Sequence, residues 1–159
     1  MPDLQGKAIE TLGVREQYRD QYWLKRDPIY HDRLLWRAQS FRHMVHLLPK
    51  QSILELGCGQ GLWTRQLVRV SRGENPITSV SFCPDGTRPD QLPEAVEFLS
   101  VTSLPSALAG RCFDFVIATD LLDQRNCAWF LQHVYELLKP GQVIFYESNP
   151  WNVVLKLRQ

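Results

Sequence analysis

Short apolar segments that alternate with helix-like segments limit the fold of this chain more than any other feature. Five segments have the length and composition of buried β-strands and are bounded by turn-forming residues, namely Ile53–Leu56, Ile77–Phe82, Val96–Val101, Phe113–Ala118 and Val143–Tyr146. Apolar residues at three- and four-residue spacing predict amphipathic helices at Tyr30–Leu48 and Ala128–Leu138, and Gly61–Val70 predicts a shorter one. Such alternation is typical of parallel βαβ units. We therefore expect an α/β fold with a doubly wound, mostly parallel, Rossmann-like sheet.

Prolines and glycines define where these elements should end. Residues 84–94 contain three prolines, so we expect no full helix between the second and third strands. Ser103–Gly110 should be a loop or a short helix. Asp27-Pro28 is expected to begin the first amphipathic helix, and Lys139-Pro140-Gly141 to end the last one.

The bulk composition excludes several classes of protein. A length of 159 residues fits one domain, and 44% hydrophobic with 22% charged residues is typical of a globular chain with a core. A net charge of +1 gives no global attraction to nucleic acid or to membranes. The chain shows neither a signal peptide at its start nor an apolar run of membrane-spanning length. The four cysteines are scattered, which indicates reduced thiols and a cytoplasmic location.

The segment ILELGCGQG, Ile53 to Gly61, places a carboxylate inside an apolar strand and three glycines directly after it. A dinucleotide fingerprint needs G-x-G-x-x-G, but Leu62 stands where its third glycine belongs. A phosphate-binding loop would end in Gly-Lys-Ser/Thr, which this chain lacks, and Glu55 would repel a phosphate. A ligand that carries an ammonium group and a sulfonium suits this loop better.

Three motifs in order resemble the class I S-adenosylmethionine-dependent methyltransferases. ILELGCGQG resembles their first motif, E/D-x-G-x-G-x-G, and FDFVIATDLLD at 113–123 resembles their fourth-strand motif. FLQHVYELLKPGQVIFYE at 130–147 resembles the helix, turn and fifth strand of the small-molecule branch. The resemblance covers roughly residues 30–150. It implies S-adenosylmethionine as cofactor and methyl transfer to a small-molecule acceptor. Because the net charge is only +1, no nucleic-acid partner is expected.

The resemblance also implies roles for individual residues around the cofactor. Glu55 would orient the methionine ammonium group, and Gly57 and Gly59 would pass beneath the methionine portion. Phe82 would lie against the adenine, and further contacts would come from Ser103 and Thr119.

The sequence departs from the family at two cofactor positions. Ser81 and Thr102 stand where acids usually bind the ribose and the adenine amino group, so we expect weaker cofactor binding than in the family. Asp85 could reach the ribose instead. Loss of these acids also favours an alternative function, a degenerate binding or scaffold domain without activity. A nicotinamide-dependent oxidoreductase is disfavoured by the missing third glycine and by Glu55.

Residues that follow the fourth and fifth strands are the candidates for contact with the acceptor. They are Asp120, Tyr146 and Asn149, for which loop capping is an equally good interpretation. No residue is identified as a catalytic base. His43 and His46 are three residues apart but lack a third ligand, so no metal site is expected.

We expect one methyltransferase-like domain over residues 1–159. Residues 1–49 should form an N-terminal helical cover, with the Tyr18–Leu48 region over the cofactor edge, followed by a core at 50–148 and a tail at 149–159. Members of this fold usually continue past the fifth strand. The chain is therefore expected to be either a fragment of a larger protein or an unusually short member of the fold. If it is a fragment, a second domain or an edge-strand partner is expected after residue 159.

Overall fold

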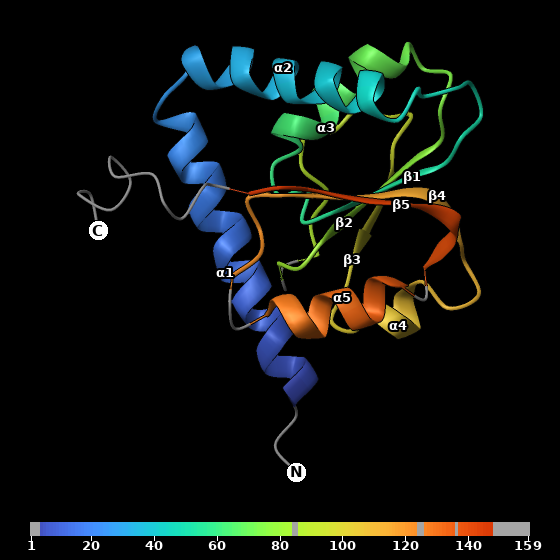
Figure 1. The fold of residues 1–159 in the computed structure, drawn as a ribbon. Coiled ribbons are helices and arrows are strands. Elements are labelled where there is room, and N and C mark those ends of the chain that lie inside the picture. Colours follow the sequence, from blue (N-terminus) through green and yellow to red (C-terminus); the bar gives the residue numbers. More distant parts are fainter. Residues whose placement is uncertain (1–3, 84–85, 124–125, 136, 148–159) are drawn as a thin grey trace.

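A computed structural model describes residues 4–83, 86–123, 126–135 and 137–147 (Figure 1). The predictions for Asp85, Asn149 and the tail at 149–159 lie outside these residues. One parallel sheet contains five strands in the order β3-β2-β1-β4-β5. The strands are β1 Ile53–Leu56, β2 Ile77–Ser81, β3 Glu97–Ser100, β4 Phe113–Thr119 and β5 Leu138–Tyr146. The predicted doubly wound sheet is confirmed.

Helices cover both faces of the sheet (Figure 1). They are α1 Leu4–Leu24, α2 Ile29–Met44, α3 Leu62–Ser71, α4 Leu104–Ala107 and α5 Cys127–Tyr135. One core cluster joins the sheet to α4 and α5, and a second joins it to α2 and α3. β1 lies in the centre with all four residues buried, which explains why its sequence is apolar on both faces apart from Glu55.

The strand order reverses beside β1. From β1 the chain continues to β2 and β3 on one side, and β4 then returns to the other side of β1. Ligands of open parallel sheets bind at such a switch point, beyond the carboxyl ends of the strands. The glycine-rich loop after β1 therefore lies where this fold places a ligand.

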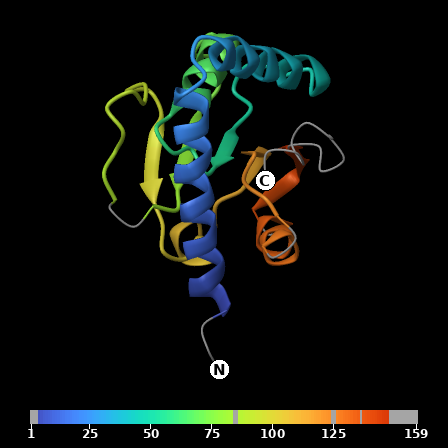
Figure 2. The ribbon, with the colours of Figure 1, turned by 90° about the vertical axis from the view of Figure 1, so that its left-hand side faces the viewer.

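The helix α1 crosses the carboxyl edge of the sheet (Figures 1 and 2). Ile9 and Leu12 pack into the cluster beneath the sheet, and Trp23 packs into the cluster above it. α1 lies within the helical cover expected at residues 1–49, and the part of it that crosses the sheet edge includes residues before the Tyr18–Leu48 region expected there. The apolar pattern of an amphipathic helix is interrupted here, because the middle of the buried face of α1 consists of charged residues.

The end of the last helix was predicted wrongly. α5 ends at Tyr135, and β5 already begins at Leu138, so Lys139-Pro140-Gly141 lies inside the strand and does not form a turn. Phe113 pairs with Leu138, whereas Phe115 pairs with Gln142, so the register shifts here, and this bulge-like irregularity accommodates the extra residues of β5. Proline is tolerated at bulges because no ladder hydrogen bond is lost there.

The connection from β2 to β3 contains no helix in its described residues, as the three prolines predicted. β3 consequently has only exposed and half-buried residues. None of the described helices combines the length and the apolar character that a membrane span requires.

Candidate functional site

The glycine loop follows β1 in a conformation that favours glycine. Gly57, Gly59 and Gly61 have φ values of 76°, 53° and 76°, in the left-handed region. The N–H groups of Gly57 and Cys58 donate to the Val80 carbonyl oxygen at 2.8 and 2.9 Å, which ties the loop to β2. A Cβ atom at Gly57 would approach the Leu121 side chain to 2.8 Å. The loop therefore depends on glycine for both its conformation and its packing.

Glu55 lies below this loop with 3% of its surface exposed. One carboxylate oxygen accepts hydrogen bonds from Thr64 Oγ1 at 2.6 Å and from Ser79 Oγ at 2.9 Å. Burial raises the pKa of Glu55 from 4.5 to about 7, although both hydrogen bonds lower it. In this structure Glu55 thus connects β1 with β2 and α3.

Two carboxylates from α1 bind the outer side of the loop. Glu16 accepts hydrogen bonds from the Gly59 N–H at 2.8 Å, the Ser81 hydroxyl at 2.6 Å and the Phe82 N–H at 2.9 Å. Asp20 accepts one from the Gln60 N–H at 2.6 Å. Burial raises the pKa of Glu16, opposed by the nearby Arg19 and by these hydrogen bonds. Glu16 and Asp20 are both buried.

Arg19, on the same helix, forms an ion pair with Asp20 and interacts electrostatically with Glu16. Its guanidinium donates to Asp20 Oδ1 at 2.8 and 3.0 Å and to the Thr119 carbonyl oxygen at 2.9 Å. It also lies over the ring of Trp23 at 4.5 Å. One buried cation therefore faces two buried carboxylates, and the group connects α1 with the end of β4.

The donors around the loop fit a ligand with hydrogen-bond acceptors. The backbone N–H groups of Gly59, Gln60 and Phe82 already hold carboxylate oxygens, so they can equally hold hydroxyl or carboxylate oxygens of a nucleoside-type ligand. With α1 in place they are occupied, and the position of a Cβ atom at Gly59 coincides with Asp20. In this structure, side chains of α1 therefore take up the donors of the loop and the space beside Gly59.

The other predicted cofactor residues are distributed along this edge. Ser81, the Phe82 backbone and the Thr119 carbonyl are brought together under α1. The Phe82 side chain is buried in the cluster beneath the sheet, so its ring packs in the core. Thr102 is exposed and Ser103 is half-buried, and both follow β3 farther along the edge.

Two of the predicted acceptor residues lie side by side next to the loop. Asp120 has a φ of 48° and forms an ion pair with Arg37 Nη1 at 2.7 Å. Its N–H donates to the Tyr146 carbonyl oxygen at 2.6 Å, and Arg37 lies 5.9 Å from the Tyr146 ring. This places α2 over the ends of β4 and β5.

Three buried polar atoms near these residues lack a hydrogen-bond partner within the described part of the chain. They are Trp63 Nε1, Thr119 Oγ1 and Tyr146 Oη. Thr119 pairs in register with Tyr146, whose ring lies 5.9 Å from that of Trp63. Burial raises the pKa of Tyr146 to about 12, so its hydroxyl remains a donor at neutral pH. Buried polar groups without partners are costly, and they mark this spot as able to bind a polar group.

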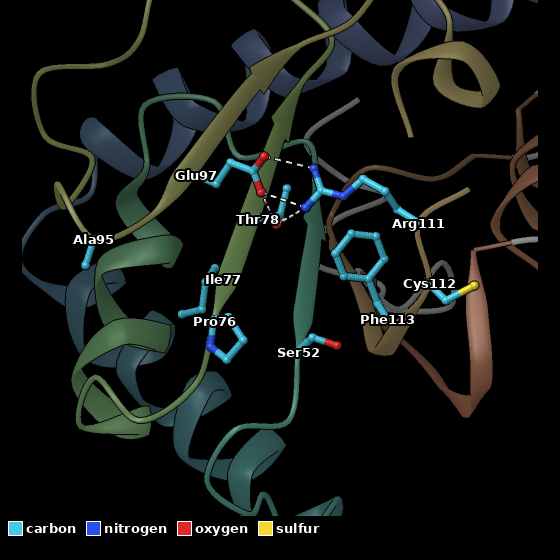
Figure 3. Close-up of a pocket in the computed structure, with 9 residues that line it drawn as sticks. All are labelled: Ser52, Pro76, Ile77, Thr78, Ala95, Glu97, Arg111, Cys112 and Phe113. Atoms are coloured by element: carbon cyan, nitrogen blue, oxygen red, sulfur yellow. Dashed lines mark hydrogen bonds and ion pairs between the residues drawn. The ribbon is translucent and has the colours of Figure 1, made fainter. Parts of the chain in front are cut away.

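A separate cleft of about 390 Å³ lies at the opposite edge of the sheet (Figure 3). It is lined by residues at the amino ends of strands, such as Ser52 before β1 and Pro76 before β2. Its charged residues neutralise each other, because Arg111 donates to both carboxylate oxygens of Glu97 at 2.6 and 2.9 Å. This cleft therefore lacks the chemistry and the position of a ligand site. Within the described ranges, no group of three His, Cys, Asp or Glu residues could hold a metal.

Sequence reasoning missed Glu16, Arg19, Asp20 and Arg37. A signal for the first three exists in the sequence. Ile9, Leu12, Glu16, Arg19 and Trp23 follow one another at three- and four-residue steps, which is helical spacing. Because this stripe contains Glu16 and Arg19, the sequence pattern indicated a solvent-exposed segment and not a buried helix face.

Comparisons with known proteins agree with this architecture. No family model matches the chain. It is 29% identical over 127 residues to a mitochondrial ubiquinone biosynthesis O-methyltransferase of Mus musculus, covering 76% of this chain and 34% of that relative. It is 23% identical over 156 residues to the tRNA N(3)-methylcytidine methyltransferase trm140 of Schizosaccharomyces pombe, covering 84% of this chain and 49% of that relative. The chain thus spans between about a third and a half of these curated relatives.

A solved structure extends the likeness to the whole chain. The plantazolicin methyltransferase BpumL, crystallised with a pentazolic desmethylPZN analog and SAH, matches with a TM-score of 0.67 at 11% identity. The match covers 100% of this chain and 66% of that protein. The curated relatives and the solved neighbour are methyltransferases, and the chain has the fold of the class I S-adenosylmethionine-dependent methyltransferases.

Proposed function

We propose that this protein binds S-adenosylmethionine at the glycine loop and transfers the methyl group to a small-molecule acceptor. One observation carries the proposal. The backbone N–H groups of Gly59, Gln60 and Phe82 lie at the switch point of the sheet, where each donates to a carboxyl oxygen of Glu16 or Asp20. The names of the methyltransferase relatives support the same reaction class.

Bound S-adenosylmethionine supplies an electrophilic methyl group on a sulfonium. In the proposal, the loop glycines let the ligand approach the backbone, and Ser81 and the Phe82 N–H hold its ribose. Glu55 lies below the loop and accepts hydrogen bonds from Thr64 and Ser79. In this way it fixes the position of the loop and, through the loop, that of the methionine portion of the ligand. Thr102, Ser103 and Thr119 add contacts at the ends of β3 and β4.

The acceptor is proposed to bind beside Asp120 and Tyr146. The unpartnered Trp63 Nε1, Thr119 Oγ1 and Tyr146 Oη offer hydrogen bonds to a polar group of the acceptor. No side chain is assigned as a general base. The rate enhancement would come from holding the nucleophile against the methyl group in a site without water.

A small molecule is favoured over a nucleic acid as the acceptor. One relative acts on tRNA by its name, but the net charge of +1 gives this chain no general attraction to phosphate backbones. A degenerate domain that binds the cofactor without transferring the methyl group is the second candidate, favoured by Ser81 and Thr102. We further propose a single domain located in the cytoplasm.

A thermal-shift measurement with S-adenosylmethionine, S-adenosylhomocysteine and NAD tests the binding step. A ligand at about 100 times its Kd should raise the Tm by roughly 5–10 °C. Gly59→Val should abolish this shift, because valine disfavours the φ of 53° and its side chain would fill the space beside the loop. Gly73→Val is the matched control, since Gly73 also has a positive φ but nothing within 4 Å of the added Cβ. A shift with NAD alone would contradict the proposal.

Transfer of a tritiated methyl group separates the candidate functions. Labelled S-adenosylmethionine is incubated with the protein and either a small-molecule extract or total tRNA. Label in the small-molecule fraction that Gly59→Val abolishes supports the proposed acceptor class. Label in tRNA would replace it with a nucleic-acid acceptor, and binding without transfer to either would favour the degenerate domain.

A further inference from the structure

Two acidic side chains of α1 occupy the hydrogen-bond donors that a ligand would use. Glu16 uses both of its carboxylate oxygens on Gly59, Ser81 and Phe82, and Asp20 binds the next loop amide, at Gln60. Both acids are buried, with 0% and 4% exposure. Such contacts are charge-assisted hydrogen bonds, which are stronger than hydrogen bonds between neutral groups.

We propose that α1 is a built-in competitor of the cofactor, and that S-adenosylmethionine binds only after α1 has left the carboxyl edge of the sheet. The inference rests on the proposed function, because it concerns regulation of the same site. Docked α1 and the ligand need the same N–H donors and the same space beside Gly59. They therefore exclude each other.

The alternative is that Glu16 replaces the missing strand-end acid and itself binds the ribose. That role requires a carboxylate oxygen directed at the ligand. In the structure Oε1 is held by Gly59 and Ser81, and Oε2 by Phe82. Both oxygens of Glu16 are thus used by donors of the protein itself. These contacts favour competition between Glu16 and the ligand over binding of the ligand by Glu16.

The packing of α1 suits a helix that can detach. The centre of its buried face consists of charged groups, where a single cation, Arg19, faces the carboxylates of Glu16 and Asp20. The desolvation of these charged groups offsets part of the stability that their hydrogen bonds contribute. Gly13 lets α1 pack closely against the backbone of Phe82, because a Cβ atom at Gly13 would lie 2.7 Å from the Phe82 carbonyl oxygen. Substitution at Gly13 can therefore displace α1 without changing a charge.

Competition predicts an unusual combination of effects. The apparent Kd is the intrinsic Kd divided by the fraction of molecules in which α1 is detached. The double variant Glu16→Ala/Asp20→Ala should therefore bind S-adenosylhomocysteine at least about tenfold more tightly than wild type, although its Tm without ligand is lower. Gly13→Ala should shift both quantities in the same directions. A merely structural helix would lower the Tm without tightening binding.

Calorimetric titration with S-adenosylhomocysteine measures these affinities in the full chain. The control is Glu10→Ala, which removes one carboxylate from an exposed position of the same helix and should leave the Kd unchanged. Weaker binding by Glu16→Ala/Asp20→Ala, with Gly13→Ala no tighter than wild type, would overturn the competition and assign Glu16 to the ligand. Absence of binding in wild type and all variants would overturn the proposed function itself.

Hydrogen exchange provides a readout that does not depend on variants. With saturating S-adenosylhomocysteine, the amides of α1 should exchange faster than in the ligand-free protein, because a detached polar helix is marginally stable. The amides of Gly59 and Phe82 should stay protected, since the ligand replaces Glu16. Unchanged or slower exchange of α1 in the complex would refute the competition while leaving cofactor binding intact.

Discussion

At the scale of single residues, Glu55 makes stability depend on pH. Its pKa is raised from 4.5 to about 7 by burial. The native state therefore holds this proton more tightly than the unfolded state, and the stabilisation is complete below about pH 4.5 and is lost as the pH rises through about 7. The hydrogen bonds from Thr64 and Ser79 reduce this effect without reversing it.

Glu55→Gln should remove this pH dependence. Between about pH 5 and pH 8 the wild type should lose on the order of 3 kcal/mol of unfolding free energy relative to the variant. Urea unfolding at both pH values measures the difference, and Glu94→Gln, at an exposed position, is the control. Parallel pH profiles for wild type and Glu55→Gln would show that Glu55 does not titrate in this range.

Ser81→Asp should destabilise the protein in a way that depends on Glu16. The Ser81 hydroxyl donates to Glu16 at 2.6 Å, so an aspartate would replace a donor with a second negative charge. The expected cost is about 1–3 kcal/mol, and it should largely disappear when Glu16→Gln is also present. Denaturant unfolding of the four proteins in a double-mutant cycle checks this. Additive effects would mean that the two side chains do not interact.

At the scale of elements, α1 and β1 should respond differently to loss of an apolar side chain. Leu12 anchors α1 and Leu54 lies in the central strand, and both are fully buried. Leu54→Ala should lower the global unfolding free energy by about 2–5 kcal/mol and speed exchange throughout the core. Leu12→Ala should speed exchange mainly in α1. Equal changes in both elements would show that α1 unfolds only together with the sheet.

The elements also show which parts of the fold a sequence can predict. The β1–loop–α3 unit was predicted within a residue at each end, because apolar runs and positive-φ glycines act locally. β5 was misjudged, because Lys139-Pro140-Gly141 is a turn signal that pairing with β4 overrides. α1 lies within the helical cover expected at residues 1–49, but its bounds were not predicted, because the periodicity of apolar residues alone does not report a buried face with charged residues in its middle.

The candidate site divides in the same way. Gly57, Gly59 and Ser81 were proposed from the sequence because the glycine motif and the strand ends can be read locally. Glu16 and Asp20 reach the site from 40 or more residues away in sequence, so only the packing of α1 brings them there. Local motifs therefore located the loop. The side chains that bind it in this structure, Glu16 and Asp20, depend on the tertiary fold and could not be read from local sequence.

At the scale of the whole molecule, the two core clusters share the sheet and should unfold together. Leu104 is buried beneath the sheet and Leu67 above it. Each substitution to alanine should cost about 2–5 kcal/mol and shift one and the same transition. Circular dichroism and tryptophan fluorescence during denaturant unfolding should coincide. A variant that shifts only one of these signals would divide the molecule into two folding units.

The helix-free connection between β2 and β3 has a consequence for behaviour at high concentration. β3 ends the sheet with half-exposed residues, and an open strand edge is a template on which a second molecule can add a strand. Glu97 on β3, held by Arg111 and Thr78 at the cleft of Figure 3, places charge along this border. Charged side chains on edge strands oppose edge-to-edge assembly, so we expect Glu97 and Arg111 to disfavour the addition of a second strand at β3.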